Sequence, residues 1–229
     1  MAEPLLAPGR KSVKMDGMRS LGSLWILAIL GTGPALASGL PTIDPKEAAT
    51  RRGPIERGDD VDTARLIGVK APALPDLRWL DGEPRSLESL AGQVVVIRSF
   101  TNECPFCAAT MPSLQALNER YGGRVVVLGV YHPKPPRSVE AADVAEFAQS
   151  LGVTFPVAVD EDWSLVRGWW KDYSAGSWTS ITWVLDRKGM IRAVHPGGEY
   201  HDSGGKAHAA CRADYVKLQR TIDRLLAEQ

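Results

Sequence analysis

The chain has 229 residues, with 27 basic and 27 acidic side chains and a formal net charge of zero at pH 7. This balance offers no electrostatic attraction to nucleic acid, so we expect no nucleic-acid partner. Three cysteines are too few for a small domain held together by several disulfides. The composition is that of one ordinary globular domain with extensions.

Residues 1–37 have the pattern of an export signal. Lys11 and Lys14 precede an uncharged apolar stretch at 21–30, and Ala35-Leu36-Ala37 is a small-x-small cleavage site. The apolar stretch is short and is followed by glycine and proline, which argues against a membrane-spanning helix. An uncleaved membrane anchor is the alternative. Under either interpretation we expect an exported protein, in the periplasm or an equivalent compartment.

Residues 38–68 are expected to form a flexible N-terminal arm, and the folded domain is expected to span 69–229. The arm is rich in proline, glycine and charged residues and shows no sustained hydrophobic period. At the start of the domain, the segments 77–80 and 84–87 flank the turn Asp81-Gly82. This pattern predicts a short hairpin ahead of the main sheet.

The rest of the domain alternates strands and helices. Strands are predicted where apolar, often β-branched residues form short runs, and helices where apolar residues recur every three or four positions. In chain order we predict a strand at 93–100, a helix at 104–121, a strand at 124–131, a helix at 139–151, a strand at 156–159, a short helix at 163–170, a hairpin at 181–185 and 190–195, and a helix at 212–228. This order predicts parallel crossovers followed by an antiparallel hairpin, hence a mixed sheet.

The most informative motif is Cys104-Pro105-Phe106-Cys107, where a buried strand ends and a helix begins. A helix N-terminus carries about half a positive charge, which favours the thiolate of Cys104, and the thiolate is the nucleophile. A disulfide spanning two residues constrains the unfolded chain very little, so a purely structural bridge is disfavoured. The motif predicts a redox site in which Cys104 attacks a disulfide and Cys107 resolves the mixed disulfide. The direction of electron flow is left open.

With these elements the chain resembles the thioredoxin fold, specifically its TlpA/ResA-like branch, over roughly residues 69–195. It is also similar to the thioredoxin-like domain of DipZ-type proteins. The resemblance rests on the strand before Cys104-x-x-Cys107 and Met111-Pro112, on the helix and strand around Pro156, and on the hairpin at 183–189. It implies an α/β, thioredoxin-like fold: a central mixed β-sheet flanked by helices, with an N-terminal hairpin extension and a central helix-strand insertion.

The same resemblance implies an exported thiol–disulfide oxidoreductase. Reductases are the most common members of this branch, so a reductase is expected. Its substrates would be thiols or disulfides of partner proteins, and its electrons would come from a membrane or periplasmic donor. No organic cofactor and no metal site is implied.

Two positions depart from the family pattern. The family's cis-proline facing the active site is replaced by Ser180; a cis bond before a non-proline residue costs roughly 2.5–4 kcal/mol, so we expect a trans Thr179–Ser180 bond. That loop normally contacts substrate and shields the sulfurs, so Thr179 and Ser180 are assigned to the substrate loop. The tryptophan usual before the first cysteine is replaced by Glu103, which would raise a nearby thiol pKa and is expected to point into solvent.

Two other functions stay open. Thr101 and Cys104 form the T-x-x-C of peroxiredoxins, but Ile97 stands where that family needs proline. The other alternative is a non-enzymatic metal (copper) binding or delivery protein, because His208 and Cys211, three residues apart, could share a metal. All four histidines lie in the second half of the chain: His132, His195, His201 and His208. Otherwise Cys211 is either a half-buried thiol or a third redox partner.

Overall fold

The computed structural model describes residues 63–172 and 177–228. The predicted export signal at 1–37 and most of the predicted arm lie outside these residues. Within the described ranges, no helix combines the length and apolar character needed to cross a membrane.

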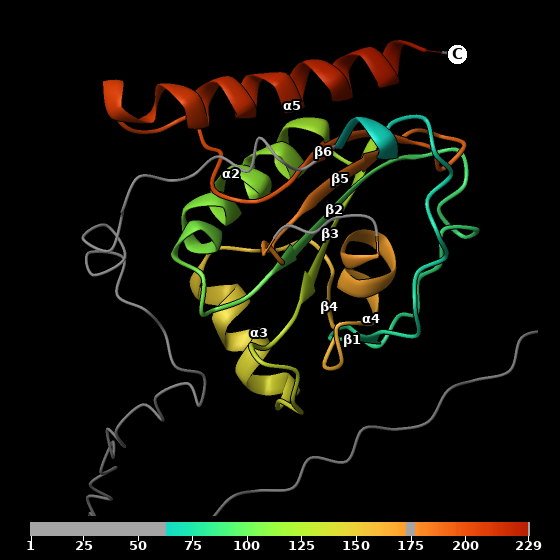
Figure 1. Ribbon diagram of the computed structural model, residues 1–229, viewed down its shortest axis with the longest axis vertical. Helices are drawn as coiled ribbons and strands as arrows, with labels where there is room; N and C mark the ends of the chain where they lie inside the picture. Colours follow the sequence, from blue (N-terminus) through green and yellow to red (C-terminus); the bar gives the residue numbers. More distant parts are fainter. Residues whose placement is uncertain (1–62, 173–176, 229) are drawn as a thin grey trace, which may run out of the picture. The chain divides into compact units, whose positions relative to one another are not determined.

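The domain is built on one six-stranded sheet with the order β1-β4-β3-β2-β5-β6 (Figure 1). Its strands are β1 (Arg78–Trp79), β2 (Val94–Phe100), β3 (Val125–Tyr131), β4 (Val157–Val159), β5 (Thr182–Leu185) and β6 (Ile191–His195). The β2–β3 and β3–β4 pairs are parallel, and the β1–β4, β2–β5 and β5–β6 pairs are antiparallel. This mixed sheet confirms the predicted fold class.

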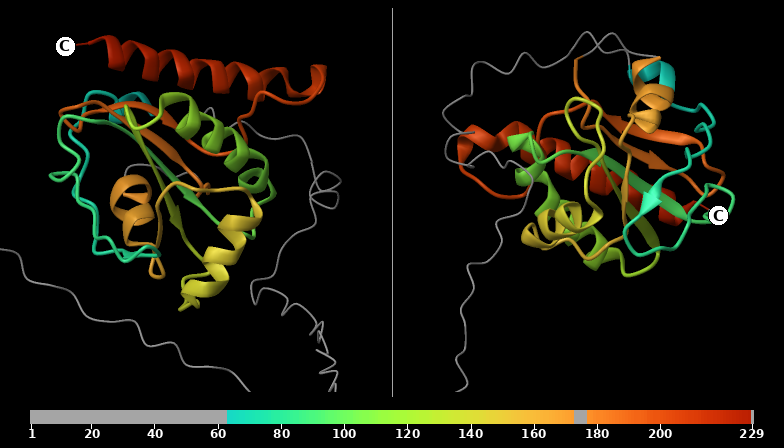
Figure 2. Two further views of the ribbon diagram at one scale, coloured as in Figure 1. Left: turned by 180° about the vertical axis from the view of Figure 1, so that it is seen from behind. Right: turned by 90° about the horizontal axis from the view of Figure 1, so that it is seen from below.

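Helices cover both faces of the sheet, so every residue of the central strand β2 is buried. The helices are α2 (Pro105–Tyr121), α3 (Ala141–Ser150), the short α4 (Ser164–Val166) with η2 (Arg167–Lys171), and α5 (Ala209–Ala227), with the 3₁₀ turns η1 (Thr63–Leu66) and η3 (Lys206–His208). Helices α2, α3 and α5 share one core cluster with the sheet. The α4–η2 segment and η1 share the other, and the two views in Figure 2 show these layers.

Helix α2 carries the cysteine motif and has well-defined ends. Cys104 is its N-cap residue and Pro105 opens it, where a missing backbone N–H costs nothing. Gly122 ends it in the left-handed conformation, with φ 47°, and donates its N–H to the carbonyl of Asn118. The sequence prediction of a helix from 104 to 121 is therefore confirmed to within one residue.

The predicted hairpin at 77–87 is wrong. The Asp81-Gly82 turn forms, with the N–H of Gly82 donating to the carbonyl of Trp79 at 3.1 Å. However, β1 pairs with β4, from the predicted helix-strand insertion, and not with the segment after the turn. Arg85 instead folds back, binding Asp81 at 2.7 Å with its guanidinium 4.7 Å from the ring centre of Trp79. Burial of Trp79 in the core thus selects a distant strand as partner.

The folded part begins earlier than residue 69. Leu66 in η1 is buried in the core. The N–H of Gly68 donates to the carbonyl of Ile191 at 2.7 Å, and the N–H of Ile191 donates to Val69 at 2.8 Å. Residues 63–68, which were expected to belong to the arm, therefore pack against β6.

Candidate active site

The two cysteines of the motif differ in accessibility. Cys104 is partly exposed at the N-terminus of α2, whereas Cys107, with 0% exposure, is sealed inside the core. The N–H of Cys107 donates to the carbonyl of Cys104 at 3.0 Å, which closes the first turn of the helix. Of the two sulfurs in the motif, only that of Cys104 is therefore accessible from the surface.

Arg98 provides a positive charge beneath the cysteines. It lies in β2 and is fully buried, its guanidinium donating to Thr182 Oγ1 at 3.1 Å and to the carbonyl of Gly198 at 3.2 Å. The guanidinium also lies 5.6 Å from the ring centre of Tyr200. No carboxylate of the described residues lies within ion-pair distance of Arg98, and its charge lowers the pKa of both thiols.

The two thiols are hydrogen-bonded to each other, so the ionisation of one affects the pKa of the other. Burial disfavours a charge on Cys107, but the hydrogen bond from Cys104, the charge of Arg98 and the Ser180 hydroxyl outweigh burial and lower the pKa of Cys107 to about 5. The hydrogen bond with Cys107 and burial raise the pKa of Cys104. Arg98 thus lowers the pKa of both thiols, whereas the Ser180 hydroxyl acts on Cys107 alone. The expectation that Cys104 is the more acidic thiol stays a prediction.

The loop of Thr179 and Ser180, which the sequence analysis predicts to be the substrate loop, contacts the buried cysteine directly. Ser180 Oγ lies 3.1 Å from Cys107 Sγ, and the Thr179–Ser180 bond is trans, as predicted. Ser99 Oγ fixes the loop by donating to the carbonyl of Thr179 at 2.7 Å and accepting the N–H of Ile181 at 2.8 Å. A serine at this position supplies a hydroxyl for the thiolate, which a proline could not do.

His132 supports the same loop from behind. Its Nε2 lies 2.9 Å from Thr179 Oγ1, and its ring packs edge-on against Trp163 with centroids 5.5 Å apart. Burial, with a smaller contribution from Lys134 and Arg98, lowers the pKa of His132 to about 3. His132 is therefore a neutral hydrogen-bonding partner of Thr179 at neutral pH.

Glu103 does not point freely into solvent. Its carboxylate forms an ion pair with Arg137 at 2.8 Å and accepts the N–H of Lys134 at 3.4 Å. The expectation of a solvent-directed side chain is therefore wrong, because Arg137 in the loop after β3 captures the charge. The paired carboxylate is drawn toward that loop.

An aromatic wall stands beside the dithiol. The rings of Phe106 and Trp178 meet edge-on with centroids 5.9 Å apart. The indole of Trp178 packs over Gly197, where an added Cβ would come within 2.6 Å of the ring. Gly197 therefore permits this position of Trp178, at the edge of the cysteine motif.

Of the four histidines named as candidate metal ligands, two lie together and the other two lie in separate places. His201 and His208 lie together with Cys211 and with Glu199, which the sequence analysis did not name. His132 supports the substrate loop, and His195 lies against Tyr200 and near Asp214. The four histidines therefore do not converge on one site.

Comparison with known proteins identifies the family. A family model described as Redoxin matches residues 67–209. The thioredoxin-like protein YneN of Bacillus subtilis is 30% identical over 130 residues, covering 57% of this chain and 71% of YneN. The thiol-disulfide oxidoreductase YkuV of the same organism is 24% identical over 163 residues, covering 71% of this chain and 93% of YkuV.

A solved structure gives the same result. The thiol-disulfide isomerase from Corynebacterium glutamicum superposes with a TM-score of 0.54 and 28% identity, covering 69% of this chain and 98% of that protein. These similarities agree with the mixed sheet and with the resemblance to the TlpA/ResA-like branch. The chain belongs to the Redoxin family and is a thiol–disulfide oxidoreductase with a thioredoxin-like fold.

Proposed function

We propose that this oxidoreductase is exported and acts as a reductase, its Cys104–Cys107 dithiol exchanging with cysteines of partner proteins. The observation that carries the thiol exchange is a partly exposed Cys104 placed over a fully buried Cys107, and the direction rests on the resemblance to the TlpA/ResA-like branch. One sulfur is reached by the substrate, and the other stays protected until the mixed disulfide has formed.

The reaction uses both thiols in turn. With Cys107 protonated, the Cys104 thiolate attacks the substrate disulfide; one substrate sulfur leaves as a thiolate while a Cys104–substrate bond forms. Cys107 then gives its proton to that leaving thiolate and attacks Cys104, which releases the second substrate sulfur. Cys107 supplies one proton and solvent supplies the other, so the substrate gains two electrons and two protons, and the protein ends with a Cys104–Cys107 disulfide. A thiol donor in the membrane or periplasm must reduce that disulfide again.

The substrate loop and the aromatic wall provide the contact surface for a peptide substrate. Thr179 and Ser180 are held rigidly through Ser99, and Phe106 and Trp178 offer apolar edges beside the exposed sulfur. Because these contacts are made beside the reacting atoms, they would orient a cysteine-containing segment toward Cys104. The substrate class is therefore an exposed disulfide of a partner protein.

Export rests on the sequence of residues 1–37, as either a cleaved signal or an anchor. Cell fractionation of the full-length protein tests it. Recovery in the cytoplasmic fraction would contradict export and would leave the oxidoreductase activity intact.

The reduction potential of the Cys104–Cys107 pair tests the direction. We expect a value nearer to that of thioredoxin, roughly −270 mV, than to that of DsbA, roughly −120 mV. Because the lowered pKa of Cys107 stabilises the reduced form, we expect the potential to lie above that of thioredoxin while remaining nearer to it than to that of DsbA. A value near that of DsbA would make the protein an oxidant and would contradict the proposed direction.

Trapping tests the roles of the two cysteines. A Cys107→Ser variant should accumulate mixed disulfides with partner proteins through Cys104. The matched Cys104→Ser variant should accumulate none, because Cys107 is buried. Equal trapping by both variants would reverse or abolish the assigned roles.

A further inference from the structure

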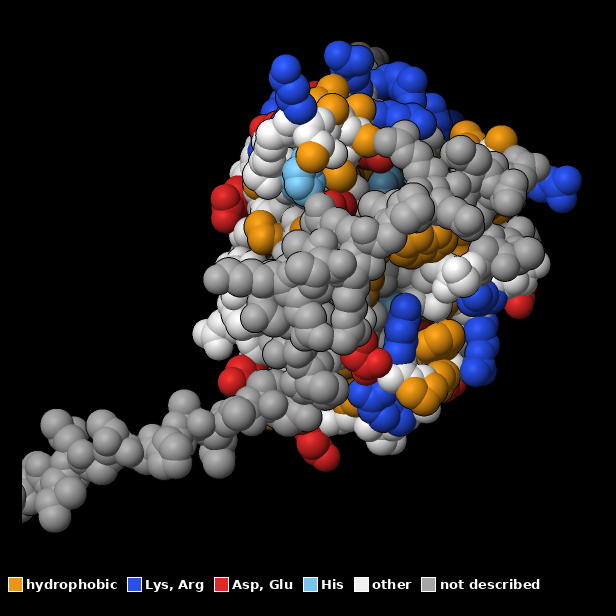
Figure 3. Space-filling model, turned by 60° about the vertical axis from the view of Figure 1, so that its left-hand side comes forward, with side chains coloured by type: hydrophobic (Ala, Val, Ile, Leu, Met, Phe, Trp, Pro, Cys, Tyr) orange, Lys and Arg blue, Asp and Glu red, His pale blue; other side chains and the backbone are white. Residues whose placement is uncertain are grey.

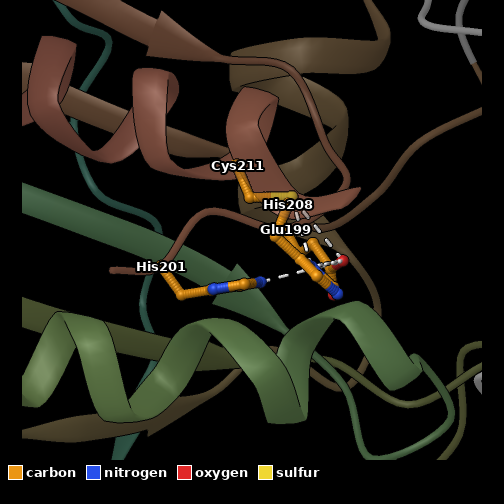
Figure 4. A group of neighbouring side chains, drawn as sticks. All are labelled: Glu199, His201, His208 and Cys211. Carbon is orange, nitrogen blue, oxygen red and sulfur yellow. Dashed lines mark hydrogen bonds and ion pairs between the residues drawn. The ribbon is translucent and has the colours of Figure 1, made fainter. Parts of the chain in front are cut away.

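A second cluster of reactive side chains lies outside the dithiol site. It consists of Glu199 and His201 in the loop after β6, His208 at the end of η3, and Cys211 in the first turn of α5. Figure 4 shows the side chains converging from the loop and the helix start. One ligand atom from each of the four lies within 4.8 Å of the other three.

Four of the six distances between these ligand atoms are close to the edge lengths of a tetrahedron around a metal ion. Glu199 Oε1 lies 3.5 Å from His208 Nδ1, 3.8 Å from His201 Nε2 and 3.7 Å from Cys211 Sγ, and Cys211 Sγ lies 3.9 Å from His208 Nδ1. Zn²⁺ bonds of 2.0–2.3 Å to nitrogen, oxygen and sulfur place neighbouring ligands roughly 3.3–3.8 Å apart. Direct charge-assisted hydrogen bonds between these groups would be shorter, about 2.7–2.9 Å.

The surrounding residues hold the ligands in this arrangement. Ser203 Oγ lies 3.1 Å from His201 Nδ1, which turns Nε2 toward the cluster. Arg212 donates to the carbonyl of Gly204 at 2.7 Å and fastens the loop to α5. Gly204 has φ +90° and packs so closely on His208 that an added Cβ would lie 2.7 Å from its ring. Such outer contacts commonly orient the histidine ligands of metals.

The cluster is largely shielded and still accessible. The side chains of Glu199 and His201 are 4% and 7% exposed, and that of His208 is 24% exposed. A groove of about 670 Å³ runs past Glu199, His201 and His208 and is bounded on its other side by Ala108 and Pro112 of α2. Some histidine side chains also reach the surface on the face drawn in Figure 3. An ion can enter from the groove, and the low exposure of Glu199 and His201 limits their contact with bulk water.

The donor set points to zinc. Two imidazole nitrogens, a thiolate and a carboxylate are all zinc ligands, whereas copper(I) favours soft sulfur donors without a carboxylate. The charges of one thiolate, one carboxylate and one Zn²⁺ sum to zero, which suits a shielded site. We propose that Glu199, His201, His208 and Cys211 bind one Zn²⁺ ion in a four-coordinate structural site. Binding releases the Cys211 thiol proton to solvent, ties the loop to α5 and keeps Cys211 out of thiol exchange.

Zinc stoichiometry tests the proposal. In the full-length Cys104→Ser/Cys107→Ser variant, Cys211 is the one remaining cysteine of the sequence. This variant is dialysed against EDTA, mixed with zinc chloride, filtered and analysed for metal. About one Zn²⁺ per chain is expected. Adding Cys211→Ser or His208→Gln should abolish stoichiometric binding, and the matched control His195→Gln should retain it. No bound zinc in the starting variant, or equal binding after Cys211→Ser, would overturn the proposal.

Cobalt and a supporting residue provide a second test. Co²⁺ added in place of zinc should give the intense absorption of a tetrahedral thiolate complex, and Cys211→Ser should remove its sulfur charge-transfer band. Ser203→Ala should weaken zinc binding by about tenfold or more while the stoichiometry is kept. An octahedral cobalt spectrum without the sulfur band would contradict the assigned ligands. Because the dithiol is absent from these variants, failure here leaves the proposed reductase function untouched.

Discussion

The dithiol site and the cluster of Glu199, His201, His208 and Cys211 each place a charged side chain near a cysteine, and the two charges have opposite signs. Arg98 is the positive charge near Cys107, and Glu199 is the negative charge near Cys211. Cys107 is the more deeply buried of the two, yet its pKa falls to about 5, because its hydrogen bond from Cys104, Arg98 and the Ser180 hydroxyl outweigh burial. Burial and the Glu199 carboxylate both raise the pKa of Cys211. The difference in pKa between Cys107 and Cys211 therefore follows from their neighbouring groups and not from the extent of burial.

The two regions meet at one loop. The carbonyl of Gly198 accepts a hydrogen bond from Arg98, and the next residue, Glu199, belongs to the proposed zinc site. The N–H of Tyr200 also contacts Thr110 Oγ1 of α2 at 3.4 Å. The loop thus keeps the Glu199 carboxylate close to the dithiol region while directing it toward Cys211. Substitutions at one site at a time can therefore test the difference between the surroundings of Cys107 and of Cys211.

Removing the exposed thiol should have the largest effect. Cys104→Ser is expected to reduce disulfide exchange to the background rate of the reducing buffer, because the remaining thiol of the pair is buried. The measurement is the rate of insulin reduction with dithiothreitol as donor. Cys211→Ser in EDTA is the matched cysteine-to-serine control and should keep the wild-type rate. Loss of exchange in the Cys211 variant would erase the distinction between the two thiols.

Local sequence patterns predicted most of the fold. The β-branched runs of β2 and β3 and the Gly122-Gly123 stop act through nearby residues, so the bounds agree to within one or two positions. The hairpin at 77–87 failed because its outcome depended on a distant partner. Trp79 pairs with Ala158, almost 80 positions later, and no local pattern encodes that choice.

The site was only partly visible in the sequence. Cys104 and Cys107 form a local motif, and His208 and Cys211 have helical spacing, so both pairs could be named. Arg98 was missed although an arginine inside a fully buried strand is a signal by itself. Glu199 was missed because its role depends on the loop that brings it beside His208.

His132 tests the electrostatics behind the substrate loop. Its folded pKa of about 3 lies below the unfolded value of 6.5, so its contribution to stability is full above pH 6.5 and is lost as the pH falls toward 3. Between pH 7 and pH 5 this histidine should cost about 2 kcal/mol of unfolding free energy. Urea denaturation of the Cys104→Ser/Cys107→Ser variant, with and without His132→Gln, measures the difference. An identical pH slope in both proteins would contradict the buried, neutral His132.

Substitution of Arg98 tests whether its positive charge lowers the pKa of the dithiol. Arg98→Met should raise the apparent pKa of the dithiol from about 5 by about one unit, because the neighbouring positive charge is lost. The reduced form then loses about 1.4 kcal/mol, and the reduction potential falls by about 30 mV. Thiolate absorbance in a Cys211→Ser background gives the pKa, and glutathione equilibration gives the potential. A purely structural role would lower stability and leave both quantities unchanged.

Ser180 should contribute less than Arg98, since its hydroxyl offers one hydrogen bond to the thiolate and no net charge. Ser180→Ala should raise the apparent pKa of the dithiol in the same direction and by a smaller amount than Arg98→Met. The same absorbance titration measures it, with Ser99→Ala as a comparison that alters the loop without removing the hydroxyl near Cys107. A downward shift for Ser180→Ala would contradict hydrogen bonding to the thiolate.

The smallest effect is expected when the Glu199 carboxylate near Cys211 is neutralised. Glu199→Gln removes the carboxylate that helps to raise the pKa of Cys211, while burial, the larger cause, persists. Alkylation of Cys211 at fixed mildly alkaline pH, in EDTA and in a Cys104→Ser/Cys107→Ser background, should therefore become modestly faster. Glu228→Gln, a change at the far end of α5, is the matched control and should leave the rate unchanged. Slower alkylation after Glu199→Gln would mean that the carboxylate makes the Cys211 thiol more reactive. The charges near Cys107 and Cys211 would then no longer have opposite effects on the two thiols.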